Sequence, residues 1–175
     1  MRNLGIPGSR KRRKGNLNFG RERGAVAVLV AASMAVLIGF VGLALDLGKL
    51  FVTKTELQNS ADACALAAAR ELSGTNNNQL MLAEEAGIAV GVRNNVMFQN
   101  ESINVSGSNI TFSETFDGAY MPKGSVANVL AVRFVRCTVQ RVDIPNWFMQ
   151  VLGMGDQQVN ATAVASLVPS QTTCA

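Results

Sequence analysis

A run of 22 residues without a single charge, at positions 24–45, constrains this chain more than any other feature. About 20 apolar residues are enough for a helix to cross a hydrocarbon layer roughly 30 Å thick. A cleaved secretory signal is the competing interpretation, but its apolar region is typically only about 7–15 residues long and ends at a small-residue cleavage site. The length of the run and the lack of a clear cleavage site favour a retained membrane anchor.

The charges on the two sides of this run differ in sign. Residues 1–23 contain eight Lys and Arg against one acidic residue, whereas eight basic and eleven acidic residues follow the run. Positive charge beside a membrane span stays on the cytoplasmic side, so we expect a basic cytoplasmic tail at 1–23 and export of residues 46–175. The cluster SRKRRKG also fits a nucleic-acid or nuclear-import patch. Beside a span we interpret it as a topology signal on anionic lipid, and we expect no nucleic-acid partner.

The apolar pattern narrows after the run instead of stopping. Over residues 46–73 it recurs at helical spacing as one stripe, and polar residues such as Glu56 fill the other positions. No proline interrupts the segment, and its alanine-rich part favours a helix as far as Ser73-Gly74. We therefore predict that a transmembrane helix at 24–45 continues as an exported helix over 46–73. The stripe comprises Leu50, Leu57, Ala61, Cys64, Ala68 and Leu72.

Small side chains recur every four residues along the span. They are Ala27, Ala31, Ala35 and Gly39. Small residues let two membrane helices approach closely, so we predict that this face packs against the helix of another subunit or of a second copy. At the outer end of the span, Asp46 and Lys49 are spaced to face one another at the lipid head groups, and we predict a membrane-edge pair there.

The exported residues 74–175 indicate an α+β domain. We expect a second helix in NNNQLMLAEEAGIAVGVRNN and a hairpin in ESINVSGSNITFSETF, with its apolar residues facing inward. VANVLAVRFVRCTVQRV is typical of a strand, IPNWFMQVLGMG of a short helix and QVNATAVASLVP of a final strand. The fold class is therefore a long helix packed on a small antiparallel sheet of about four strands. The inward residues of the expected hairpin are Ile103, Val105, Ile110 and Phe112.

The side chains that support catalysis are scarce in this chain. There is no histidine, which removes the commonest general base and transition-metal ligand, and no nucleophile, phosphate or metal motif is present. We expect no enzyme activity, no cofactor, no metal and no small-molecule substrate. The three cysteines lack metal spacing, and an exported compartment favours a disulfide. We predict that Cys137 pairs with Cys174, and that Cys64 is buried as a small apolar residue.

Two stretches resemble a known family. GLALDLG at 42–48 and ELQNSADACALAAA at 56–69 are similar to the N-terminal region of TadE/TadG-like proteins of the Tad (Flp, tight-adherence) pilus apparatus, and the resemblance covers residues 21–72. Downstream, VRCTV, WFMQVLG and ATAVAS are similar to TadG-like exported regions. The resemblance implies a bacterial inner-membrane, pilin-like subunit or assembly factor. Pseudopilins of this system are cut after a glycine with glutamate five residues later. Leu29 stands at that position after Gly24, which favours the uncut, TadG-like type.

The leading hypothesis is therefore a bitopic, non-enzymatic component that assists assembly or anchoring of a Tad-like pilus. Its partners would be membrane lipid and other pilus-assembly membrane subunits, or a second copy of itself. The alternative hypothesis is a membrane-anchored, exported module that binds an envelope polymer or a host surface. An enzyme ranks last, because the chain lacks catalytic motifs.

Overall fold

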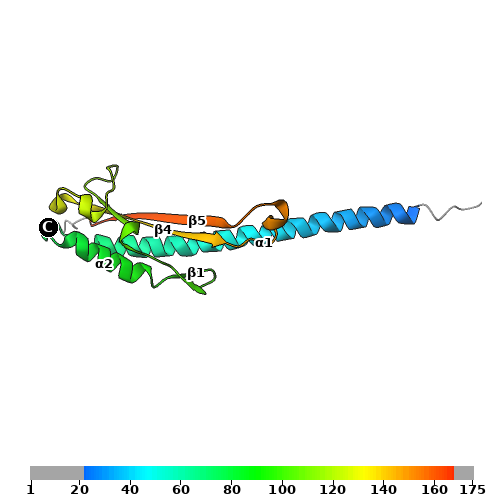
Figure 1. The fold of residues 1–175 in the computed structure, drawn as a ribbon, viewed down its shortest axis with the longest axis horizontal. Coiled ribbons are helices and arrows are strands. Elements are labelled where there is room, and N and C mark those ends of the chain that lie inside the picture. The colour runs from blue at the N-terminus through cyan, green and yellow to red at the C-terminus, as the bar shows by residue number, and fades with distance from the viewer. Residues whose placement is uncertain (1–21, 168–175) are drawn as a thin grey trace, which may run out of the picture. The chain divides into compact units, whose positions relative to one another are not determined.

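The computed structural model describes residues 22–167, and its longest element is helix α1 at Glu22–Ala69, 48 residues (Figure 1). The described chain divides into two compact units after Phe40. In the first unit, every described side chain of α1 from position 24 onward is exposed. By length and composition, α1 is the one helix of the described residues apolar enough to cross a membrane. The prediction of one helix that continues without a break past Asp46 is confirmed.

Helix α1 ends slightly earlier than predicted. Past Ala69 the backbone turns more tightly, because the N–H of Leu72 bonds the carbonyl of Ala69 at 3.1 Å, three residues back. Gly74 follows with φ +74°, a left-handed conformation that glycine adopts without steric cost. Ser73-Gly74, where the helix was predicted to stop, therefore forms a turn after a short segment that is no longer α-helical.

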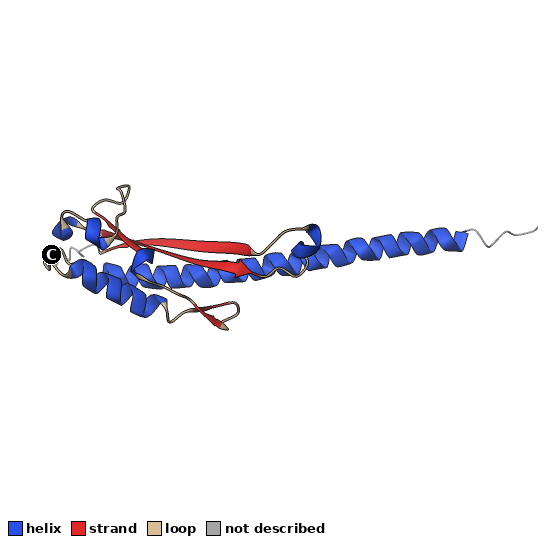
Figure 2. Cartoon of the chain, in the orientation of Figure 1, coloured by secondary structure: helices blue, strands red, loops and turns tan. Residues whose placement is uncertain are grey.

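The second unit begins at Val41 and is an α+β domain, as predicted. Helix α2 covers Gln79–Gly91 and was predicted. The main sheet has three antiparallel strands in the order β3-β4-β5, and two short strands, β1 and β2, form a separate hairpin (Figure 2). Their bounds are β1 Asn95–Val96, β2 Glu101–Ser102, β3 Ile110–Ser113, β4 Phe134–Ile144 and β5 Gln157–Ser166.

The sheet lies along α1, as Figure 2 shows for its two long strands. The Lys54 ammonium donates to the carbonyl of Asn160 on β5, and the Gln58 amide donates to that of Thr162 at 3.3 Å. The buried face of α1 follows the predicted stripe, except that Leu50 is only half-buried. This stripe and the inward side chains of β3, β4 and β5 form one core.

The predicted hairpin around Gly107 is wrong. In its first half only Glu101–Ser102 is a strand, β2, and it pairs with β1. Gly107–Asn109 is a 3-10 turn, and β3 pairs with β4, with Ile110 opposite Cys137. The burial prediction was nevertheless correct, because Ile103 and Val105 are buried together with Ile110 and Phe112. Alternation determines which side chains face the core, but a period of two residues carries no information about the partner strand.

Two glycines of α2 allow it to lie close to α1. A Cβ added at Gly91 would lie 3.2 Å from the Cβ of Cys64, and one at Gly87 would lie 3.3 Å from both the Cβ of Ala68 and the carbonyl oxygen of Cys64. The hydroxyl of Ser60 donates to the Gly91 carbonyl at 2.9 Å across this contact. Glycine lowers the helix propensity of α2, and close packing on an alanine-rich helix is the compensation.

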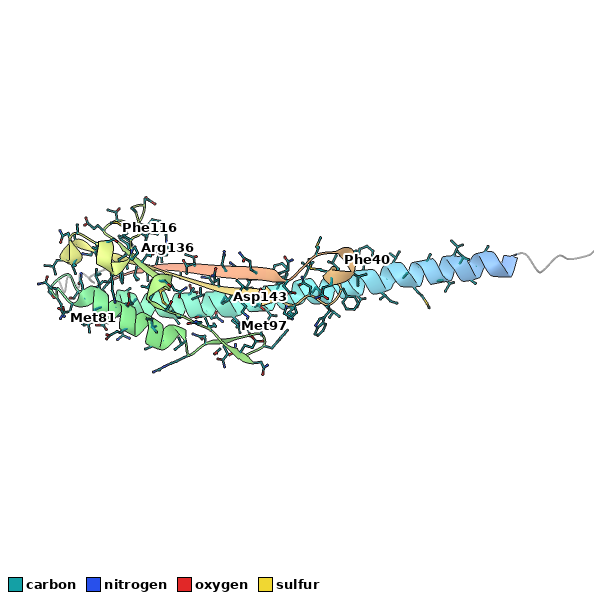
Figure 3. All side chains as sticks on the ribbon, viewed as in Figure 1. Phe40, Met81, Met97, Phe116, Arg136 and Asp143 are labelled. Atoms are coloured by element: carbon teal, nitrogen blue, oxygen red, sulfur yellow. A yellow bond between two sulfur atoms is a disulfide. The ribbon has the colours of Figure 1, made fainter. Side chains whose placement is uncertain are left out.

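The segments between strands are mostly short 3-10 turns. The expected strand from residue 126 begins only at Phe134, because Val129–Ala131 forms such a turn. The expected short helix after β4 is the 3-10 turn η4 at Met149–Leu152. One extra residue on β4 before Ile144 makes a bulge, where Asp143 has φ +57°. Asp143 and Met97, another left-handed residue, are labelled in Figure 3.

Candidate functional site: two loops anchored on helix α1

The carboxylate of Asp46 holds the loop that joins β4 to β5. Its Oδ1 accepts the backbone N–H of Trp147 at 3.0 Å, and its Oδ2 accepts those of Phe148 and Met149 at 2.8 Å each. The side chain is 2 % exposed. These N–H groups lead into turn η4, where they have no partner within the turn, so the carboxylate satisfies donors that would otherwise be buried and unpaired.

The ionisation of Asp46 reflects this geometry. Burial acts to raise the pKa of its carboxyl, but the three backbone N–H groups and the charge of Lys49 outweigh burial and hold the pKa below the ordinary value of 3.8. The group is therefore a carboxylate at neutral pH, the form that accepts all three hydrogen bonds.

Three further contacts dock the β4–β5 loop. The ring of Phe148 lies against Gly42, where an added Cβ would be 2.2 Å from the ring. The ammonium of Lys49 donates to the Pro145 carbonyl at 2.9 Å, and the Asn146 amide donates to the Gly155 carbonyl at 2.8 Å across the base of the loop. Glycine is required at position 42 because any side chain would displace the ring.

The predicted pair of Asp46 and Lys49 does not form a salt bridge. Among the described residues the salt bridges join Lys123 to Glu84, at 2.6 Å, and Arg141 to Glu101. Both members of the predicted pair instead bind backbone groups of the β4–β5 loop. Spacing on one helix could not reveal that a loop about 100 residues further along the chain would take both side chains. Their position at a membrane edge stays a prediction.

The carboxylate of Glu56 anchors a second loop, between β1 and β2. It accepts the backbone N–H of Phe98 at 3.3 Å and of Gln99 at 3.2 Å, and the Gln99 side-chain amide at 3.2 Å. Met97, Phe98 and Gln99 all have φ between 57° and 64°. Left-handed backbone costs about 1–2 kcal/mol per non-glycine residue, so hydrogen bonds must support this turn. Glu56 was expected on the polar face of α1, and it is buried.

The disulfide prediction is wrong. Cys64 on α1 bonds Cys137 on β4, with their Cα atoms 6.2 Å apart. Cys174 lies outside the described residues. Cys64 is fully buried, as predicted, but as a covalent link between the helix and the central strand. Helical periodicity placed Cys64 on the buried face of α1, and Cys137 was expected in a strand. Their pairing depends on how far α1 is shifted along the sheet, which the sequence pattern does not determine.

The predicted packing face on α1 is available for contact. Ala27, Ala31, Ala35 and Gly39 are all exposed, and no heavy atom lies within 4 Å of a Cβ added at Gly39. No residue within 22–167 buries this face, and its role in helix packing stays a prediction.

The described part of the second unit contains cavities. One of about 250 Å³ lies beside Phe112 and Met121, and one of about 350 Å³ is lined largely by polar side chains from the segment 102–109 and from β4. Within residues 22–167, no group of three His, Cys, Asp or Glu side chains is placed to hold a metal ion.

Sequence analysis missed the two anchoring roles of α1. The available signal was polar residues at helical spacing on the apolar stripe, because Asp46, Thr53, Glu56 and Ser60 are all buried. A buried polar group needs a partner, so such positions predict a contact with another segment without saying which one.

A comparison with family models gave a match over part of this chain. Residues 24–71 match the Tad family, described as "Putative Flp pilus-assembly TadE/G-like". The matched span contains Gly42, Asp46, Glu56 and Cys64, which make the loop, anchor and disulfide contacts described above. Comparisons with curated proteins and with solved structures gave no match. The match supports a Tad-type N-terminal region, and it does not distinguish TadE-like from TadG-like proteins.

Proposed function

We propose that the chain is a non-enzymatic, single-pass membrane component of a Tad/Flp-type pilus-assembly system, of the TadG-like type. It would lie in the bacterial inner membrane with residues 1–23 in the cytoplasm and the α+β domain exported. One observation carries the proposal: the segment that matches the Tad family is a single helix, exposed and apolar at one end and the buried spine of a domain at the other.

The proposed mechanism is assembly through helix packing. The exposed face of small residues on α1 would meet the membrane helix of another pilus-assembly subunit or of a second copy, because small side chains let backbones approach. The same helix, α1, would supply both the span and the core of the exported domain. Assembly or anchoring of the adhesive fibre would then depend on contacts in lipid.

Site-specific photo-crosslinking in living cells tests this mechanism. A crosslinker at Ala31 or Ala35 is expected to capture a pilus-assembly subunit or a second copy. Leu29 and Leu37 are matched controls, because at about 100° per residue they lie on the opposite face of the same helix. Equal capture from both faces, or none from the small face, would contradict the packing mechanism. Deletion of the gene should abolish surface fibres and adherence, and unchanged piliation would count against the function itself.

One observation favours the alternative, an anchored binding module. The 350 Å³ cavity presents hydroxyl and amide side chains, including Ser102, Asn104, Ser106 and Gln140, which suit the hydroxyl groups of an envelope polysaccharide. If binding is the function, the chain retains envelope polymer in a pull-down, and Asn104→Ala reduces retention. Recovery of pilus subunits, unaffected by Asn104→Ala, would support the assembly role instead.

A further inference from the structure

The β4–β5 loop presents an unusual concentration of large apolar side chains to solvent. Trp147 is 68 % exposed, Val151 84 %, Leu152 69 % and Met154 49 %. No charged residue occurs from position 144 to position 155. Contiguous exposed apolar side chains mark surfaces that are covered in the working protein. The question is what covers this one.

The loop is held so that these side chains stay outward. The Asp46 carboxylate fixes three consecutive amides at its start, and the Asn146 side chain ties the start of the loop to the Gly155 carbonyl at its end. Met149 is the side chain of turn η4 that is buried. Val151 and Leu152, in the same turn, point away from the domain, so the loop cannot bury them by local rearrangement without losing these bonds.

The position of the loop along α1 indicates what covers its exposed apolar side chains. Phe148 lies against Gly42, and Asp46 binds the loop one helical turn further on. Gly42 is within the last turn of the uncharged run that ends at Leu45. A helix rises about 1.5 Å per residue, so the loop flanks the last several ångströms of that run. In Figure 1 turn η4 of this loop, drawn in orange, lies against α1.

The side chains at this level are those of a membrane interface. Tryptophan concentrates where hydrocarbon meets head groups, and lysine keeps its ammonium at the head groups while its stem is apolar. The ammonium of Lys49 lies 5.6 Å from the ring centre of Trp147 and bonds the Pro145 carbonyl. The loop therefore has an apolar tip beside the end of an apolar helix, and a cation on the polar side.

We propose that the β4–β5 loop is a second membrane contact, with Trp147, Val151 and Leu152 inserted at the boundary between head groups and acyl chains of the outer-facing leaflet. The inference rests on the proposed membrane span, because the loop lies beside its last turn. The contact fixes the domain against the bilayer at a second point, so that it cannot swing freely about the span.

Fluorescence of Trp147, the only tryptophan, tests this in the full chain reconstituted in vesicles of phosphatidylethanolamine and phosphatidylglycerol. Lipids brominated near the head group are expected to quench Trp147, and lipids brominated deep in the chain are expected to quench it less. An aqueous quencher is expected to have little effect. V151D/L152D is expected to abolish the lipid quenching, and F116D, at another exposed apolar side chain, is expected to leave it unchanged.

A W147F/L37W variant reports on the span itself, because position 37 lies well inside the uncharged run. Two proteins are compared, the unmodified chain and this variant. Deep quenching of the tryptophan at position 37 in the variant, together with full access of an aqueous quencher to Trp147 in the unmodified chain, would overturn the loop inference and leave the proposed span intact. Absence of quenching at both positions would overturn the proposed span. Protection of Trp147 from water without any lipid quenching would mean that protein covers the loop, which also overturns the inference.

Discussion

The disulfide between Cys64 and Cys137 gives the most direct quantitative test of the fold. It closes a loop with a sequence separation of 73 residues, which contains α2, β1, β2 and β3. In the chain-entropy description, a loop of this length removes about 15 cal/mol/K from the unfolded state, or about 4 kcal/mol at room temperature. Since measured disulfides typically contribute about 2–4 kcal/mol, we expect the free energy of unfolding to fall by that amount when the bond is reduced.

Urea unfolding of the full chain in detergent micelles, followed by Trp147 fluorescence, measures this difference between oxidised and reduced protein. With a denaturant slope of about 1–3 kcal/mol/M, a loss of about 2–4 kcal/mol should lower the urea midpoint by at least roughly 0.7 M. C64A/C137A is the matched variant, and it should show the lower midpoint whether or not reductant is present. Oxidised C174A should keep the midpoint of the oxidised wild-type protein, because it retains the bond between Cys64 and Cys137.

Peptide mapping decides the pairing independently of stability. Trypsin places the three cysteines on separate peptides, 55–70, 137–141 and 142–175. Non-reducing digestion should release 55–70 linked to 137–141. A link between 137–141 and 142–175, or a midpoint that reduction does not move, would refute the reasoning from the fold.

Three further predictions concern the anchored loops. The pKa of the Asp46 carboxyl in the folded protein lies below 3.8, so its stabilisation of the β4–β5 loop is complete above pH 3.8. The stabilisation is lost as the pH falls through the folded-state pKa. Trp147 emission should report this acid transition, and D46N should remove it. Gly42→Ala should displace the loop at a cost of about 1–3 kcal/mol, whereas Gly48→Ala, in open space on the same helix, should be neutral or slightly stabilising. Glu56→Ala should accelerate hydrogen exchange of the two backbone amides bound by its carboxylate, as measured by NMR.

Each of these predictions has an outcome that contradicts it. An acid transition that is the same in D46N and wild type would show that another group governs the loop. Equal unfolding midpoints for the alanine variants at Gly42 and Gly48 would mean that Phe148 is not seated on α1. The amide of Asn100, which bonds the Val96 carbonyl, serves as the internal reference for the Glu56 variant. If exchange of the Phe98 and Gln99 amides is unchanged relative to it, Glu56 does not anchor the loop.

The helices were predictable because their signals are local. The uncharged run, the apolar stripe and the alanine content of α1 all lie within neighbouring turns, and α2 shows the same periodicity. The stripe also predicted the burial of Leu57, Ala61 and Cys64 correctly. Each of these inferences needs only the geometry of a single element.

The contacts between elements were not predictable, because each joins segments far apart in sequence. Alternation placed Ile110 inward but could not choose β4 as the partner of β3. In the same way, Cys137 was correctly expected in a strand, while its partner depends on the position of α1 along the sheet. Asp46 was singled out as an edge residue, and only the fold shows that it binds backbone from the far end of the chain.

The bonds from Asp46 span 101 to 103 positions of the chain, which bears on the order in which the domain forms. A polypeptide that emerges from a membrane with its N-terminus inside presents α1 first and β5 last. In the proposed topology, the apolar face of α1 would therefore emerge before the strands that cover it. Contacts of such long range in sequence also form slowly. In the proposed topology, the chain would have to be exported as far as β5 before the domain closes, and the apolar face of α1 would need to be covered by another protein until then.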